Sequence, residues 1–498
     1  MPKVSISLVQ RSIFTYLASC LLFGAMAWGN SDADGLLRAI GDPLDTEDVQ
    51  QAETMDLITA VNYALVHNRG LQQARLAVLN RETTLRSDQS EFRIRTTPDG
   101  TLSTGKDSSL GRYGLRFNRK LQWGTELSVR GGYEMIANDE EDDVDRATAR
   151  VQINQPLFSN AGSLVTLDPV VSSELAVVSA RRVYSATRAD LVLDVVRAYE
   201  GVLRSSRQVK AERKGVERLQ KLYRLTRARE AQGTGSKIDT LRVGVQLGDA
   251  LARLAAAVER QGGDREALGD ALGWHGEFDV ALEPSPLLKL DLPGSEEAEQ
   301  IARENRLDYA EVLQGFKDTM RKIKIAEKSL LPDMSVIGRY RRLDDTEQNE
   351  RFEFGDEDWF IGLTFGSDLN RYRERATLQQ RVLERTDARL RLEQFEYDLF
   401  RQVRQQGRAY RRALTTLQIN ARSTTLAKKR LDLAANLFEI GEGDNFTVTD
   451  AEDAYLSAQN SFFDSRAEAS LAGYRLLRVL GTLVAYPEEL KPNEIHEE

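Results

Sequence analysis

Two long intervals of the chain carry apolar residues at steps of three and four, the pattern of an amphipathic helix. Examples are Ile238, Leu241 and Val245 in one interval and Leu392, Phe395, Leu399 and Val403 in the other. Both intervals are rich in Ala, Leu, Arg, Glu and Gln, which favour helix. No proline interrupts the chain between Pro169 and Pro284, or between Pro332 and Pro487. Each interval is therefore predicted to be mostly helical.

Each helical interval is broken once by a glycine-rich turn, at residues 232–236 and 441–445. Glycine ends a helix at low cost, and a serine or aspartate begins the next helix by capping it. Each interval thus predicts a helical hairpin with a tight tip. The arm over residues 370–438 would reach about 100 Å at the helical rise per residue. A helix of that length needs neighbours along its side, as in a coiled-coil wall.

Residues 92–158 and 333–368 change to a period of two, which predicts strands with one apolar and one polar face. The best-defined runs are at residues 125–130, 149–153, 334–337 and 359–365. Acidic loops join these strands, around residues 139–145 and 344–358. We interpret the loops as solvated, with divalent-cation or surface contact as the alternative. Four strands cannot close a barrel alone, whereas three copies would supply twelve strands.

The chain also repeats itself. A helical segment with Asn68-Arg69 precedes the first strands, and one with Asn305-Arg306 precedes the second. We predict one repeat over residues 56–290 and another over 291–486, with a linker at 30–55 and a tail at 487–498. Gly233 lies 165 positions after Asn68, whereas Gly441 lies 136 positions after Asn305. The 29 extra residues of the first repeat are assigned to an additional strand hairpin around residues 93–120.

Residues 1–29 read as a signal peptide, with a positive start, an apolar run from Ile13 to about Ala27, and a small-x-small site at residues 25–27. Two alternatives stay open: Cys20 in Leu-Ala-Ser-Cys could be lipidated, or the segment could be retained as an anchor. Beyond residue 29 there is no stretch of about 18 apolar residues, so no transmembrane helix is predicted.

Composition narrows the function classes. The formal net charge of −9 argues against a general nucleic-acid binder. Cys20 is the only cysteine, which excludes an intrachain disulfide and a cysteine-based zinc cluster. The three histidines are far apart in the sequence: His67, His275 and His496. We predict no catalytic residue, no cofactor and no metal site.

Together these features resemble the TolC-type outer-membrane efflux proteins over nearly the whole mature length. The matching segments are Ala64–Arg69, Gln155–Phe158, the first tip from Gly233 to Leu241, and the second from Gly441 to Glu452. The resemblance implies an α+β membrane protein, with four barrel strands per protomer in a trimeric twelve-stranded β-barrel and a long helical barrel in the periplasm. It implies a homotrimer in the outer membrane that docks to a periplasmic adaptor and an inner-membrane pump. Such a protein is an efflux or type I secretion conduit without chemistry of its own.

By the same resemblance, Asp239 and Asp450 match acidic positions at the periplasmic entrance, where they could form a gate. Helix capping is the alternative, since both lie near the start of a returning helix, where the helix dipole favours an acid; Asp444 has the same two interpretations and is more typical of a cap. The candidate adaptor contacts are Gly233, Gly235, Ser236, Gly441, Gly443 and Asn445. A tyrosine–arginine latch of the best-known member is replaced here by Phe438 and Gly443. Arg242 and Glu439 are possible substitute links.

Two other functions are open at this point. A structural envelope protein with coiled-coil stalks would share the helices but would conduct nothing. A periplasmic adaptor would have a lipoyl-like segment between two helices, which we do not find.

Overall fold

The structure is a computed structural model that describes residues 54–105, 108–138, 144–276, 278–288, 290–291, 293–347 and 356–492. Several predicted features lie outside these residues: the signal peptide with Cys20, almost all of the 30–55 linker, the acidic loop residues 139–143 and 348–355, and the end of the tail with His496. Residues Met55–Glu498 form one compact unit. None of the described helices is long and apolar enough to cross a membrane.

The order of elements in this unit repeats, as predicted. The first half contains α3 (Leu57–His67), α4 (Arg69–Ser90), β2 (Arg95–Thr104), β3 (Ser108–Lys120), β4 (Glu126–Asn138), β5 (Val144–Pro156), α5 (Ser163–Thr166), α6 (Asp168–Ala231) and α7 (Lys237–Leu272). The second half contains α8 (Ser295–Asn305), α9 (Leu307–Ser329), β7 (Asp333–Glu347), β8 (Asp356–Gly366), α10 (Tyr372–Glu439) and α11 (Asn445–Leu480), followed by η1 (Glu488–Leu490). A small sheet pairs β1 (Thr54–Met55) with β6 (Ala281–Leu282).

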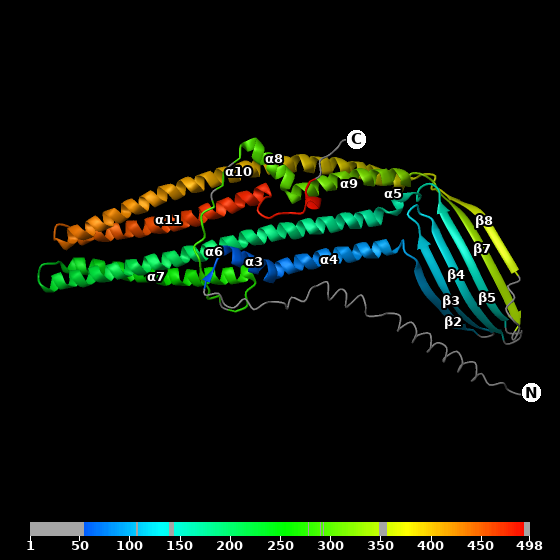
Figure 1. Cartoon of the computed structure of the whole chain (residues 1–498), viewed down its shortest axis with the longest axis horizontal. Helices are drawn as coiled ribbons and strands as arrows, with labels where there is room; N and C mark the ends of the chain where they lie inside the picture. Colours follow the sequence, from blue (N-terminus) through cyan, green and yellow to red (C-terminus); the bar gives the residue numbers. More distant parts are fainter. Residues whose placement is uncertain are drawn as a thin grey trace, which may run out of the picture. The chain divides into compact units, whose positions relative to one another are not determined.

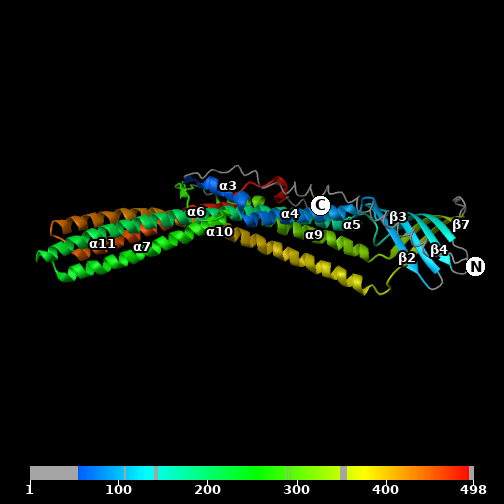
Figure 2. The ribbon, with the colours of Figure 1, turned by 90° about the horizontal axis from the view of Figure 1, so that it is seen from below.

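Two long helical hairpins form most of the unit. Helix α6 packs along α7, α10 packs along α11, and α6 also contacts α11, so the hairpins lie side by side (Figures 1 and 2). The outgoing helices α6 and α10 have 64 and 68 residues, which corresponds to about 100 Å each. The strands lie at the end of the unit away from the hairpin tips (Figure 1).

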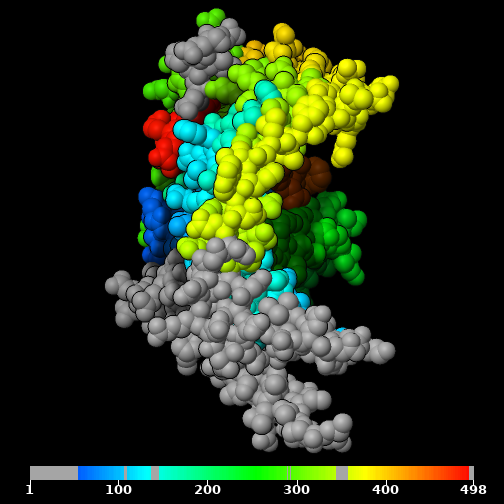
Figure 3. Space-filling view, turned by 90° about the vertical axis from the view of Figure 1, so that its right-hand side faces the viewer, coloured from blue at the N-terminus to red at the C-terminus, as the bar shows by residue number. Residues whose placement is uncertain are grey.

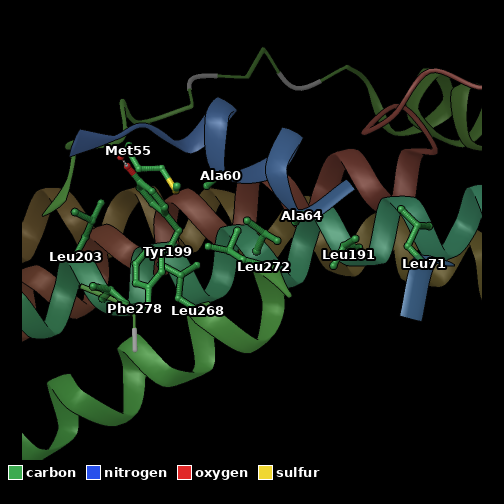
Figure 4. Packing of buried hydrophobic residues seen from close by; sticks show 12 residues of the cluster. Met55, Ala60, Ala64, Leu71, Leu191, Tyr199, Leu203, Leu268, Leu272 and Phe278 are labelled. Carbon is green, nitrogen blue, oxygen red and sulfur yellow. Dashed lines mark hydrogen bonds between the residues drawn. The ribbon is translucent and has the colours of Figure 1, made fainter. Parts of the chain in front are cut away.

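Buried tyrosines fix both hairpins at mid-length. Tyr199 donates its hydroxyl to the carbonyls of Met55 and Glu283, at 2.9 and 2.7 Å, within the first-half core (Figure 4). Burial is the main cause that raises the pKa of Tyr199, with Asp56 and Glu283 nearby. Tyr410 binds the corresponding segment of the second half. Its hydroxyl donates to the Leu288 carbonyl at 3.0 Å and accepts a hydrogen bond from the Leu290 amide at 3.0 Å.

The repeated Asn-Arg pairs lie where a short helix meets a longer one. Asn68 caps α4 by accepting from the Leu71 amide at 3.1 Å. Each returning helix ends against one of these junctions at a glycine with positive φ: Gly273 (φ 73°) beside His67 and Gly481 (φ 76°) beside Asn305. A Cβ at these positions would come within 2.6 and 2.8 Å of the neighbouring backbone, so only glycine fits.

The strands form one antiparallel sheet of six, in the order β2-β3-β4-β5-β7-β8. This sheet has two strands more than the four barrel strands per protomer that the resemblance implies. The additional hairpin predicted around residues 93–120 is present as β2 and β3, and it extends the same sheet through pairing of β3 with β4. Cyan strands of the first half lie beside yellow-green strands of the second half in Figure 3, where β5 pairs with β7.

The two faces of the sheet differ sharply in chemistry. Register and strand alternation place one set of exposed apolar side chains on the same face. They are Leu102, Tyr113, Leu115, Phe117, Val129, Val151, Ile153, Tyr340, Trp359, Ile361, Leu363 and Phe365. The opposite face carries mainly Arg, Asn, Gln, Thr and Asp, and Phe360 is its exposed aromatic exception. The sheet thus has an apolar face and a polar face, and none of the described helices covers either one.

Candidate functional site

The first hairpin tip is a glycine turn closed by a serine cap. Helix α6 ends at Ala231, and Gly233 takes the left-handed conformation with φ 74°. Ser236 then caps α7, where its hydroxyl accepts from the Ile238 amide at 3.2 Å. The tip sequence folds this way because glycine tolerates the positive φ and serine satisfies an otherwise free amide of the next helix.

The second tip uses the same design with an aspartate. Gly441 has φ 87°, and Asp444 caps α11 by accepting from the amide and hydroxyl of Thr447, at 2.8 and 2.6 Å. The Thr447 hydroxyl, followed by the Thr447 amide, lowers the pKa of Asp444. Asp444 is thus a helix cap in this structure, the interpretation that the sequence favoured.

Three polar contacts tie the two tips together. Arg229 of the first hairpin donates to the Phe438 carbonyl at 3.0 Å, and its guanidinium lies 4.4 Å from the Phe438 ring centroid. Asn445 of the second hairpin donates to the Asp239 carbonyl at 3.1 Å. Lys221 and Glu439 form an exposed ion pair at 3.4 Å. The tips are consequently held to each other within a single chain.

A buried ion pair lies further from the tips, between α6 and α11. Glu452 accepts from Arg218 Nε at 2.7 Å and from Nη2 at 2.5 Å, and it is 2 % exposed. Burial alone would lower the pKa of Arg218, but the bonds to Glu452 outweigh it and raise that pKa. A buried apolar cluster with residues from both hairpins lies in the same half of the hairpins and includes Leu219, Val243 and Leu431. The pair is therefore an internal link between hairpins.

The two candidate gate aspartates lie at different places on the returning helices. Asp239 is in the first turn of α7 and contacts Arg242 at 3.4 Å, whereas Asp450 is beyond the first turn of α11 and pairs with Arg430 of α10. Neither residue is the N-cap of its helix. Their carboxylates are 43 % and 49 % exposed, so both remain accessible to solvent or cations.

The candidate adaptor contacts are not equally accessible. Gly233, Gly235, Ser236 and Gly441 are exposed, and Gly443 is partly exposed. Asn445 is 4 % exposed and bonded to the first tip. Its side chain is therefore the least accessible of the candidate contacts in this chain.

Sequence reasoning missed the links between the hairpins. Of the two proposed substitute links, Glu439 does join the hairpins through Lys221, whereas Arg242 contacts Asp239 of its own helix. The residues Arg229 and Arg218 were not singled out, because a single arginine on a helix carries no signal of its distant partner. Among the described residues, no group of three or more potential metal ligands lies together.

Residues 299–482 match the family described as outer membrane efflux protein. No curated protein sequence matches the chain. Solved structures do: the outer-membrane channel OprN aligns with a TM-score of 0.67 at 17 % identity, covering 85 % of this chain and 89 % of that one.

Two further channels have the same fold. The CmeC outer membrane channel of Campylobacter jejuni aligns with a TM-score of 0.66 at 15 % identity, covering 86 % of each chain. The open state of the MtrE outer membrane channel of Neisseria gonorrhoeae aligns with a TM-score of 0.64 at 15 % identity, covering 86 % of this chain and 89 % of that one. At these identities the alignments establish the fold, and they confirm the TolC-like architecture predicted from the sequence.

Proposed function

We propose that this chain, which matches the outer membrane efflux protein family over residues 299–482 and has the TolC-type fold, is the subunit of a trimeric export channel. Its sheet would lie in the outer membrane and its helical hairpins in the periplasm. The channel would be a passive conduit of an efflux or type I secretion system, with no reaction of its own.

The observation that carries the proposal is the two-faced sheet. Its exposed apolar face, rich in aromatic and branched residues, matches the requirement of a surface in lipid. Its polar face matches a water-filled lumen. The edge strands β2 and β8 would leave backbone groups unpaired in lipid unless strands of other copies paired with them. Three copies of the six-stranded sheet would give eighteen strands.

Helix α10 supports lateral association with further copies. Exposed apolar residues recur along it at steps of seven, the spacing of a coiled-coil seam. They are Leu383, Leu390 and Tyr397 in one stretch and Ile419, Leu426 and Leu433 in the other. Within the described residues nothing covers these side chains. We therefore propose that a neighbouring subunit packs against this face of α10.

The tips are proposed to dock a periplasmic adaptor, with an inner-membrane pump beyond it. Gly233, Gly235, Ser236 and Gly441 are exposed there. Exposed apolar side chains surround them on both hairpins: Ile238, Leu241, Val245, Ile440 and Phe446. Exposed apolar groups around a tight turn suit contact with another protein better than contact with water.

Asp239 and Asp450 are proposed as entrance carboxylates, which three copies would bring together. Like charges at short range repel or bind cations, so replacing both with alanine should change conductance or its block by Mg²⁺. Asp249→Ala is the matched control, since Asp249 is an exposed acid further along α7. Equal Mg²⁺ block in all three proteins would refute the role of these two residues.

Purification and bilayer recording test the function as a whole. The expected result is a trimer in detergent, isolated from outer-membrane fractions, that opens discrete conductance steps in planar bilayers. A structural coiled-coil envelope protein, the main alternative, would give no conductance although it could assemble. A soluble monomer without conductance would overturn the channel proposal.

A further inference from the structure

Four arginines lie in register across four neighbouring strands on the polar face of the sheet. Arg116 of β3 pairs with Arg130 of β4, Arg130 with Arg150 of β5, and Arg150 with Arg341 of β7. We call these four residues the arginine row. Register continues to Thr97 at one end and to Asp358 at the other.

Such a row is electrostatically unfavourable in isolation. Neighbouring strands are about 4.8 Å apart, and like charges directly opposite each other destabilise a sheet. Three successive arginine–arginine pairs therefore oppose folding unless negative charge lies nearby. Arg339, one step along β7 on the same face, adds a further positive charge and stacks on Phe360.

Within the part of the chain that the structure describes, acidic side chains lie beside three of the four arginines, and Arg150 is the member of the row without one. Asp99 of β2 pairs with Arg130 and lies 4.0 Å from Arg116, and Asp358 of β8 pairs with Arg341 at 3.2 Å. Arg150 has an arginine on each side. Among the described residues, its buried Nε has no hydrogen-bond partner. Arg150 thus offers a donor and positive charge without a matching acceptor among the described residues.

We propose that the arginine row is an anion-binding belt in the channel lumen, which favours passage of small carboxylates and phosphate esters over cations. This inference rests on the proposed function, because the polar face must line a lumen for the row to meet solutes. Planar guanidinium groups bind carboxylate and phosphate oxygens well. Three copies would arrange twelve such arginines around one level of the lumen.

The position of the row supports a role in permeation. The polar-face residues of β3 are partly buried, whereas Tyr113 and Leu115 on the opposite face are 53 % and 48 % exposed. Side chains on the polar face therefore crowd together, and Arg116 is among those that are partly buried. A belt of clustered positive charge in a confined space concentrates counter-ions of the opposite sign.

The test is ion selectivity of the purified full-length channel in a planar bilayer under a KCl gradient. The wild-type reversal potential should have the sign of chloride preference, and millimolar inorganic phosphate should reduce the chloride current. Arg150→Gln should reduce the reversal potential severalfold, toward zero. Arg130→Glu should move it to zero or to the sign of cation preference. Arg150→Lys keeps the charge and should keep the preference.

Arg119→Gln is the matched control, because Arg119 is an exposed arginine of β3 on the apolar face. It should leave selectivity unchanged. A channel that conducts without anion preference, or whose row variants behave like Arg119→Gln, would overturn the arginine belt and leave the channel function standing. A protein that forms no conductance at all would refute the proposed function itself, and the belt with it.

Discussion

Removing the Glu452 carboxylate is the sharpest test of how the two hairpins are held together. Glu452 is 2 % exposed and accepts two hydrogen bonds from Arg218, at 2.7 and 2.5 Å. In Glu452→Ala, the Arg218 guanidinium would lose both acceptors within the contact between α6 and α11. Breaking a fully buried ion pair by removing one partner costs roughly 3–5 kcal/mol.

The structure argues for a value below that range. The Arg218 side chain is 37 % exposed, so water can solvate part of the guanidinium after the change. Screening by that water brings the expected loss to about 2–3 kcal/mol. The next residue provides the control: Asp453 pairs with Arg253 at 3.3 Å, and both side chains are about half exposed. Asp453→Ala should cost only about 0–1 kcal/mol.

The assay is thermal unfolding of the purified protein in detergent, followed by the helical signal. Glu452→Ala should melt several degrees lower than the wild type, whereas Asp453→Ala should melt close to it. Replacing both Arg218 and Glu452 with methionine should recover part of the loss, because no buried charge is then left alone. Equal melting temperatures for the two alanine variants would show that the buried pair does not hold the hairpins together.

Three further predictions concern the junctions and the mid-length anchors. Gly481→Ala should lower stability by more than about 1 kcal/mol, because φ is 76° and the new Cβ would lie 2.8 Å from backbone atoms; Gly248→Ala, with open space around it, should be neutral or stabilising in the same melt. Tyr410→Phe should cost about 1–3 kcal/mol by removing both hydrogen bonds of a buried side chain, each 3.0 Å long, and the same change at the 75 % exposed Tyr372 should cost little. Burial would raise the pKa of Asp318, but bonds to its lysine and arginine neighbours outweigh it and lower the pKa. Its stabilisation is present above the unfolded pKa and lost as pH falls through the lower folded value, so the stability gap between wild type and Asp318→Asn should shrink below about pH 4.

The helical hairpins and their tips could be predicted from the sequence because their signals are local. The proline-free intervals predict where the helices lie, and the glycine turns at 232–236 and 441–445 predict where the chain reverses. The structure places the tips there, with positive φ at Gly233 and Gly441. Helix caps such as Asp444 follow from the same local rules.

Contacts between segments far apart in the chain could not be predicted from the sequence. The pairing of Arg218 with Glu452 joins residues 234 positions apart, and neither side chain differs from its neighbours in composition or period. The place of the additional hairpin in the sheet was hidden for a related reason. The extra hairpin was visible as alternation around Tyr113, but only the register of β3 against β4 shows that it joins the main sheet. The arginine row likewise exists only through register.

The strand count and the arginine row together predict how selectivity should depend on salt. With strands about 4.8 Å apart and tilted by about 40°, twelve strands enclose a backbone radius of about 12 Å, and eighteen strands about 18 Å. Arginine side chains fill several ångströms of either radius. Charge is screened over about 8 Å at 0.15 M salt and about 3 Å at 1 M. If arginine side chains reach about 7 Å inward, the axis of a twelve-stranded wall lies about 5 Å from the guanidinium groups, within the screening length at 0.15 M and beyond it at 1 M, whereas the axis of an eighteen-stranded wall lies about 11 Å away. Chloride preference should therefore be clear in dilute KCl and nearly absent in 1 M KCl. A preference that persists undiminished at 1 M would contradict this reasoning, because at either radius the guanidinium charges are screened from the pore axis in 1 M salt.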